Sequence, residues 1–294
     1  MNDTIVTKQI PKRSGLLDAW RKLRRYPTTL FGFAVVGFFF LMAFIGPFVA
    51  PFGYATQNLQ AALEPPSSAH LLGTDNFGRD VFSRIIIGSR DVYVSAGSAT
   101  GLAVLFGLTI GLFSGYKGGV VDEIVMRLID VIMSIPSLLL AMVVLFSLGA
   151  SRLNLIIVIG LLYTPAVSRV VRSVVLDVKT RQFVEAAKLR GESSLYILFR
   201  EIMPNVLPHL AVEASMRFSY SIFVVASLGF LGMGIQPPAP DWGFMVADAR
   251  PWFTIAPWVL LAPVGAIALL VVAVGFMSDG LSKVLLPGGV SHGK

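Results

Sequence analysis

The sequence predicts an all-α polytopic membrane protein with six transmembrane helices. Of its 294 residues, 55% are hydrophobic and 14% are charged, whereas soluble domains carry about 25% charged residues. The mean hydropathy is +0.75, and six apolar segments are each long enough to cross about 30 Å of hydrocarbon. Because backbone amides cannot remain unpaired in lipid, each of these segments must be a helix.

The first apolar segment, 30–50, contains no charge and follows a polar and basic stretch. It is too long for the apolar part of a cleavable signal peptide, so we expect an uncleaved span. Five further spans are expected in chain order, at 92–116, 128–148, 153–175, 210–233 and 255–277. Pro136 and Pro165 should kink the third and fourth of the six.

The basic residues predict the orientation, because Lys and Arg concentrate on the cytoplasmic side of a membrane. With a cytoplasmic N-terminus, the inner segments hold 19 of the 24 Lys and Arg residues and the outer segments hold 5. Both termini are therefore expected in the cytoplasm. The chain then divides into a basic segment (1–29), a first span with an outer loop (30–91), a core of five helices (92–285) and a tail (286–294). Trp242, Trp252 and Trp258 should gather at the outer interface.

Glycines recur at helical spacing in the second predicted span. Gly97 and Gly101 are four residues apart, and Gly107, Gly111 and Gly115 form a second series. Such spacing lets two helix backbones approach closely in a membrane. We expect these glycines to pack inside the bundle, with a subunit interface or a pore lining as the alternatives.

Charged residues are scarce inside the predicted spans. Arg127 and Asp130 lie near the inner end of the third span, and Glu213 and Arg217 near the inner end of the fifth. Their spacings of three and four residues predict interfacial ion pairs, with a proton relay or a gate as the alternative. Because the middles of the spans look nearly free of charge, an ion-coupled carrier is disfavoured.

The sequence also lacks the residues that several kinds of active site or binding site require. There is no cysteine and only three histidines. A thiolate nucleophile is therefore excluded, and few Cys or His side chains could serve as metal ligands. No phosphate-binding loop of the G-x-x-x-x-G-K-[ST] type occurs. The stretch 75–80 holds two Asp residues and an Asn but misses the EF-hand spacing, so we expect an outer turn there. The chain is therefore not expected to be an enzyme, and its energy must come from an ion gradient or a partner.

The longest inner connection should fold into two short helices. Residues 179–189 are rich in helix formers, and Gly191 is placed to end that helix. A second helix can begin with Ser193 or Ser194 as its N-cap, and Pro204 should limit its extension. Two helices meeting at a glycine would form a compact projection on the cytoplasmic face.

This connection resembles a known family. Glu185, Ala186 and Ala187, then Gly191, and then Pro204 thirteen positions further on, are similar to the EAA loop of permease subunits in binding-protein-dependent ABC importers. The stretches 70–90, 126–141 and 227–245 resemble the C-type permeases of the dipeptide, oligopeptide and nickel importers. The chain departs from the family at Glu201, where isoleucine is usual, and at Met203, where leucine is usual.

The resemblance implies a permease that forms half of a translocation pathway in the bacterial inner membrane, beside a second, homologous permease. It also implies two ATPase subunits that bind ATP and Mg²⁺, one docking on the loop at about 179–208. An extracytoplasmic binding protein would deliver a dipeptide or short oligopeptide, and this chain would bind no cofactor itself. Nickel and glutathione remain alternative substrates. A self-sufficient channel or ion-coupled carrier is a more distant alternative, since it has no reason to keep the EAA loop.

Overall fold

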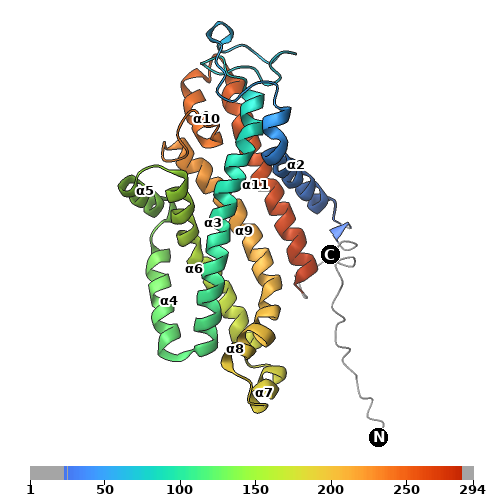
Figure 1. Ribbon diagram of the computed structural model, residues 1–294, viewed down its shortest axis with the longest axis vertical. Coiled ribbons are helices and arrows are strands. Elements are labelled where there is room, and N and C mark those ends of the chain that lie inside the picture. Colours follow the sequence, from blue (N-terminus) through green and yellow to red (C-terminus); the bar gives the residue numbers. More distant parts are fainter. Residues whose placement is uncertain (1–22, 25, 287–294) are drawn as a thin grey trace.

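The computed structural model describes residues 23–24 and 26–286, and these form a bundle of long helices (Figure 1). Within these residues there is no β-strand, only an isolated antiparallel bridge between Thr74 and Asp80. The predicted all-α class is therefore confirmed for the described part of the chain. Most of the predicted basic segment 1–29, and the tail 286–294 beyond Leu286, lie outside the described residues.

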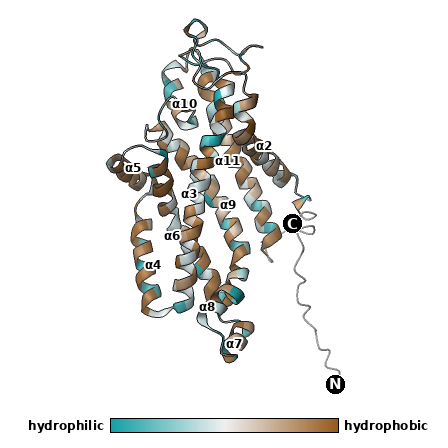
Figure 2. Cartoon of the chain, viewed as in Figure 1, coloured by the Kyte–Doolittle hydropathy of each residue, from teal (hydrophilic) through white to brown (hydrophobic). Residues whose placement is uncertain are grey.

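Four of the described helices are long and apolar enough to cross a membrane: α2 (Pro27–Val49), α3 (Val81–Lys117), α6 (Arg152–Val178) and α11 (Pro257–Leu285). Apolar residues dominate α2 and α11 in Figure 2. Helix α3 begins eleven residues before the predicted span, because the Asp80 side chain caps it by accepting the Ser83 N–H at 2.8 Å. At about 1.5 Å per residue, its 37 residues exceed the thickness of the hydrocarbon, so α3 extends beyond it.

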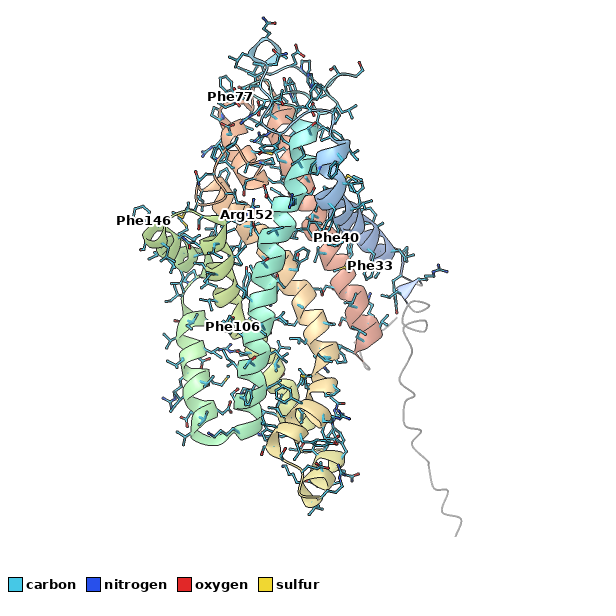
Figure 3. The ribbon with its side chains drawn as sticks, viewed as in Figure 1. Phe33, Phe40, Phe77, Phe106, Phe146 and Arg152 are labelled. Atoms are coloured by element: carbon cyan, nitrogen blue, oxygen red, sulfur yellow. The ribbon has the colours of Figure 1, made fainter. Side chains whose placement is uncertain are left out.

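The third predicted span is not one kinked helix. It is broken into α4 (Gly119–Ser134) and α5 (Ser137–Leu148), which are bent by 86°. The break falls at Ile135 and Pro136, because the residue before a proline is pushed into extended backbone, and Ile135 has φ −92° and ψ 131°. Helix α5 points away from the bundle, and its Phe146 (Figure 3) is 82% exposed.

Helix α9 (Met203–Phe230) occupies the place of the fifth predicted span. Among the described residues, however, it is not one of the four candidate helices, and the bent pair α4 and α5 raises the count only to five. The α9 sequence carries His209, Glu213 and Arg217 along with its apolar residues, which lowers its hydropathy. It nevertheless packs against α3, α6 and α11 in the centre of the bundle.

The closest packing in the bundle joins α3 to α6, and glycines make it possible. A Cβ atom at Gly107 would lie 2.5 Å from the Val167 Cβ, and one at Gly111 would lie 2.6 Å from the Ser168 carbonyl oxygen. At Gly115 the nearest atom would be the Val175 Cβ, at 3.0 Å. These three glycines therefore let two helix backbones touch along more than two turns.

The other two glycines of the predicted series do not pack in this way. A Cβ atom at Gly101 would meet nothing within 4 Å, and one at Gly97 would only reach the edge of the Phe218 ring at 4.0 Å. The prediction of helix packing is therefore wrong for this pair, because the same spacing here faces open space. Gly160 of α6 was not predicted, yet a Cβ atom there would lie 2.8 Å from the Leu102 Cβ of α3.

At one end of the bundle the connection 50–80 folds over α10 (Trp242–Ala249) and is drawn at the top of Figure 1. It contains the short helix η1 (Leu59–Ala61), and α10 is followed by η3 (Arg250–Trp252). Trp242 is 1% exposed, and its indole donates to the Ile85 carbonyl oxygen at 3.1 Å. The prediction that Trp242 belongs to an interfacial belt is therefore wrong, since this residue is part of the core.

Candidate functional site

The helical projection predicted between the fourth and fifth spans is present. Helix α7 (Gln182–Leu189) and the single turn α8 (Ser194–Tyr196) extend beyond the bundle at the end opposite the 50–80 connection (Figure 1). Ser193 caps α8 by accepting the Tyr196 N–H at 3.2 Å. In Figure 2 this projection carries both hydrophilic and hydrophobic residues.

Gly191 ends α7 in the way the sequence predicts. Its φ is +78°, a backbone conformation that glycine adopts without steric cost. The Gly191 N–H donates to the Lys188 carbonyl oxygen at 3.0 Å, and the Glu192 N–H donates to the Ala187 carbonyl oxygen at 3.2 Å. This pair of bonds is the Schellman motif, which satisfies the last carbonyl groups of a helix and turns the chain sharply.

The two faces of α7 have different roles. Ala187 and Val184 are fully buried and hold the helix against the segment that follows. Glu185 and Ala186 are exposed, and Leu189, at the tip, is 90% exposed. Leu189 therefore makes few contacts within the described part of the chain.

Pro204 does not limit the second helix. The segment α8, the π-helical turn η2 (Ile197–Ile202) and α9 follow one another without a break. Pro204 lies in the first turn of α9, and a wider π turn precedes it, where the missing proline N–H and the ring are accommodated. The prediction that Pro204 ends the helix is therefore wrong, and the projection is instead the beginning of α9 itself.

Buried side chains make this junction firm. Ile197, Leu198 and Ile202 are each at most 2% exposed and lie in the hydrophobic core. Glu201, the departure from the family pattern, faces Arg190 at 3.6 Å. A force applied to α7 would therefore reach α9 through packed side chains and a continuous backbone.

The predicted pair of Arg127 and Asp130 does not form. Arg127 instead lies 2.6 Å from Glu123, one turn before it on α4, and Asp130 pairs with Arg169 of α6. The four-residue spacing from Glu123 suits a helical ion pair, and α6 offers Asp130 a cation on the neighbouring helix. The predicted ion pair between Arg127 and Asp130 is therefore wrong.

Besides Asp130 with Arg169, two further ion pairs join neighbouring helices without having been predicted. Arg172 of α6 holds Asp122 of α4 through two hydrogen bonds of 2.6 Å. Arg152, at the start of α6 (Figure 3), pairs with Asp91 of α3. Neither pair could be found from local spacing, because the partners are 50 and 61 residues apart in the chain.

Glu213 and Arg217 are adjacent, with 2.7 Å between Glu213 Oε1 and Arg217 Nε. The Arg217 guanidinium also lies over two aromatic rings, 4.9 Å from the centre of Tyr220 and 5.6 Å from that of Tyr163. Such contacts favour a cation where water is scarce. The pair is not at the end of a span as predicted, because Arg217 is the fifteenth of the 28 residues of α9.

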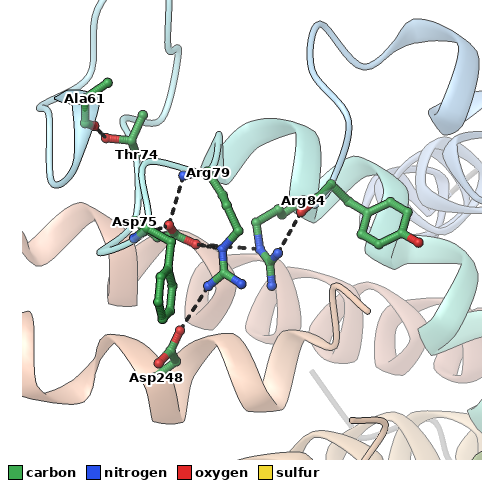
Figure 4. A network of polar contacts seen from close by, with 8 residues as sticks. Ala61, Thr74, Asp75, Arg79, Arg84 and Asp248 are labelled. Carbon is green, nitrogen blue, oxygen red and sulfur yellow. Dashed lines mark hydrogen bonds and ion pairs between the residues drawn. The ribbon is translucent and has the colours of Figure 1, made fainter. Parts of the chain in front are cut away.

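A buried polar network closes the opposite end of the bundle (Figure 4). Arg79 lies 2.6 Å from Asp75 and 3.1 Å from Asp248 of α10. Arg84 donates to the Tyr54 carbonyl oxygen at 2.7 Å. Asp75 also accepts the backbone N–H of Arg79 at 2.9 Å, so the turn expected at 75–80 is present. The network joins the 50–80 connection to α3 and α10.

Asp241, between α9 and α10, is a buried carboxylate, and no Lys or Arg among the described residues forms an ion pair with it. It caps α10 by accepting the Phe244 N–H at 2.8 Å. Burial raises the pKa of Asp241 to about 6, and the nearby charge of Asp91 acts in the same direction, although backbone N–H donors oppose them. A Cβ atom at Gly229 would lie against the Asp241 carboxylate, so the chain needs glycine at that position of α9.

The geometry defines a multi-pass membrane protein with a projecting helical loop at one end and a closed cap at the other. No cluster of His, Cys, Asp or Glu within the described ranges could hold a metal ion.

Comparison with known proteins identifies the family of this membrane protein. Residues 107–288 match the family described as the binding-protein-dependent transport system inner membrane component, and residues 14–66 match the N-terminal membrane domain of oligopeptide transport permease C.

Related proteins of known name match most of the chain. The dipeptide transport system permease protein DppC of Haemophilus influenzae is 37% identical over 98% of this chain and 99% of its own length. DppC of Alkalihalophilus pseudofirmus is 37% identical over 92% of this chain and 89% of its own length. The glutathione transport system permease protein GsiD of Pectobacterium atrosepticum is 38% identical over 92% of this chain and 90% of its own length.

A solved structure has the same fold. A chain of the MetNI methionine ABC transporter, in an inward-facing conformation, aligns with a TM-score of 0.58 over 69% of this chain and 97% of its own length, at 17% identity. The chain therefore belongs to the family of inner membrane components of binding-protein-dependent transport systems. It is a transport permease subunit of the inner membrane, in a family that works with ATPase and substrate-binding partners.

Proposed function

We propose that this chain is the permease subunit of an ATP-driven importer of dipeptides or short oligopeptides, and that it forms half of the translocation pathway. The names of its relatives support the substrate class, because both DppC proteins are dipeptide permeases and each matches more than nine tenths of this chain. The observation that carries the mechanism is the projecting loop, whose exposed tip is continuous with α9.

The proposal includes six spans with both termini in the cytoplasm. In this arrangement α9 and the bent pair α4 and α5 count as spans, in addition to the four candidate helices. The distribution of Lys and Arg supports this orientation. The α7–α8 projection then faces the cytoplasm, and the cap of 50–80 and α10 faces the outside.

The proposed cycle uses partners that supply energy and substrate. Two ATPase subunits bind ATP and Mg²⁺, and one of them receives the α7–α8 projection of this chain. A second, homologous permease completes the pathway, and an extracytoplasmic binding protein delivers the peptide to the outer mouth. ATP-driven closure of the ATPases moves α7, and α9 transmits that movement into the membrane. Such switching requires contacts that differ between the two states, which docking of the Leu189 tip provides.

Uptake by the complete complex in proteoliposomes tests the proposal. A labelled dipeptide should enter only when ATP, the ATPases and the binding protein are all present. Gly191→Asp should abolish uptake and ATPase association while the permease pair still forms. The proposal fails if uptake proceeds without ATP, or if Gly191→Asp leaves both uptake and ATPase association intact.

Glutathione import is the second candidate, because GsiD is as similar to this chain as the dipeptide permeases are. The same assay separates the two substrates. An excess of unlabelled dipeptide should suppress uptake far more than an equal excess of glutathione. The reverse order would identify a glutathione importer, and suppression by nickel alone would identify a metal importer.

A further inference from the structure

Arg217 is a charged residue in the middle of the bundle. Three neighbouring helices define its depth. Tyr163 is the twelfth of the 27 residues of α6 and lies beneath the Arg217 guanidinium. The hydroxyl of Ser219 donates to the carbonyl oxygen of Val271, the fifteenth of the 29 residues of α11.

The third neighbour is α2. Phe218 packs on Tyr93 with ring centres 5.5 Å apart, and the Tyr93 hydroxyl donates to the carbonyl oxygen of Val36, the tenth of the 23 residues of α2. Arg217 therefore lies near the middle of three candidate spans. An ionisable group at such a depth is costly to keep and marks a functional site more often than a structural one.

The guanidinium of Arg217 is only partly used by its ion pair. The 2.7 Å contact with Glu213 joins Glu213 Oε1 to Arg217 Nε, and neither atom has a hydrogen-bond partner among the described residues. The two terminal nitrogens have no hydrogen-bond partner among the described residues. They carry the planar pair of N–H groups that binds a carboxylate through two parallel hydrogen bonds.

A cavity of about 260 Å³ lies beside this guanidinium. Its walls come from α4, α6, α9 and the break at Ile135 and Pro136, and Arg217 is the one charged residue among the described residues that line it. Ile132, Met133 and Ile135 on its rim are each at least 40% exposed, so the cavity opens on the surface of the chain. It has room for one amino-acid residue rather than a whole oligopeptide.

Two exposed aromatic residues follow Arg217 on α9. Tyr220 and Phe223 are 51% and 57% exposed, and Phe223 also lines the larger apolar cavity between α5, α9, α10 and α11. A substrate moving along this face of α9 would meet aromatic rings first and then the free nitrogens of Arg217.

We propose that Arg217 binds the carboxylate of the transported peptide midway across the membrane and so favours substrates with a free C-terminal carboxyl group. This inference rests on the proposed function. Glu213 lies 2.7 Å from Nε, Tyr163 and Tyr220 contact the guanidinium through their rings, and Arg217 lines the cavity. A peptide carboxylate would supply the hydrogen bonds that the terminal nitrogens lack.

The experiment compares a dipeptide with its C-terminal amide in proteoliposomes that contain the complete complex. The binding protein is supplied in excess and saturated with each peptide, so that its own preference does not enter the rate. The variants are Arg217→Lys and the double variant Glu213→Gln/Arg217→Gln, which removes both charges and leaves no unpaired carboxylate. The double variant Glu123→Gln/Arg127→Gln removes an exposed pair of the same spacing on α4 and is the matched control.

We expect the wild type and the control to transport the free dipeptide at least about tenfold faster than its amide, as the loss of a hydrogen bond to a charged group predicts. That ratio should fall to about one in Glu213→Gln/Arg217→Gln. It should take an intermediate value in Arg217→Lys, because lysine keeps the positive charge but lacks the planar pair of N–H groups. The inference is overturned if the double variant assembles normally and keeps the wild-type ratio. Failure of the proposed function is a different result, in which the wild type itself imports neither peptide.

Discussion

Gly107 and Gly101 occupy the same helix but have opposite surroundings. The first lies against α6 and the second faces open space. In a membrane, helices associate through close packing rather than through a hydrophobic drive, so contact of α3 with α6 depends on the absence of side chains at a few positions. Gly160 of α6 likewise has no side chain at a point where α6 contacts α3.

We predict that Gly107→Ala lowers the stability of the chain and that Gly101→Ala does not. The added Cβ would lie 2.5 Å from the Val167 Cβ at Gly107, and forced overpacking costs about 1–3 kcal/mol. At Gly101 alanine fits and gains helix propensity of up to about 1 kcal/mol. Apparent melting temperatures in detergent measure both effects. Equal melting temperatures for the two variants would contradict the packing described for α3 and α6.

Asp241 should make the stability of the α10 end of the bundle depend on pH. Burial raises its pKa to about 6, against 3.8 in the unfolded chain, so the folded protein binds the proton more tightly. Stability therefore rises as the pH falls from about 7 through 6 towards 4, by about 2–3 kcal/mol at most. Above pH 6 the cost of the buried charge is fully present.

Asp241→Asn isolates this effect, because asparagine is also a good N-cap and has no charge to titrate. The apparent melting temperatures of the wild type and the variant should converge at pH 4–5 and differ at pH 7.5, with the variant higher. Other titrating groups affect both proteins and cancel in the difference. A constant difference across this range would refute the assignment.

At the level of elements, the α7–α8 projection is joined firmly to α9. Its buried face is locked to η2, its end is fixed by the Schellman motif at Gly191, and its exposed tip carries Leu189. The same chain then continues as α9, so no flexible linker separates the docking tip from the membrane helix. A movement of the tip is therefore a movement of α9.

We predict that Leu189→Asp abolishes association with the ATPase and ATP-dependent uptake, without changing the folding of the permease. Leu189 is 90% exposed in this chain, so the substitution breaks no internal contact and places a charge in the docking surface. Leu189→Met is the control, because methionine is apolar and of similar size. Co-purification with the ATPase and uptake are the measurements, and an active Leu189→Asp complex would remove the tip from the docking surface.

At the scale of the whole molecule, α9 links the two ends of the bundle. It continues the helical run that starts with α8 at Ser194, carries Arg217 at its middle and contacts Asp241 near its far end through Gly229. The helices around it are braced to one another by Asp122 with Arg172 and by Asp91 with Arg152. The projection, Arg217 and the contact with Asp241 therefore lie along one continuous run of helix.

Much of this architecture could be predicted from the sequence. Apolar length located the helices, and the capping residues Gly191 and Ser193 located the projection, because both signals are local. The sequence predicts only a kink at Pro136, where the helix is broken, and a stop at Pro204, where a π turn accommodates the proline. Local pattern does not determine how a helix continues after a proline.

The contacts between distant segments could not be predicted in this way. The depth of Arg217 depends on which residues of α2, α6 and α11 lie beside it, and the partner of Asp130 is on another helix. The glycines at 97 and 101 have the same spacing as those at 107 and 111, yet only the second pair meets a neighbour. Spacing identifies a face of a helix, and tertiary packing determines what lies against it.

The central claim is that the α7–α8 projection faces the cytoplasm and docks on an ATPase. The chain contains no cysteine, so Ala186→Cys provides a single, exposed thiol next to the tip. In inside-out vesicles a membrane-impermeant maleimide should label it, and the bound ATPase should protect it. In right-side-out vesicles the same thiol should remain unlabelled. Labelling from the outside, or labelling that the ATPase does not reduce, would contradict the account.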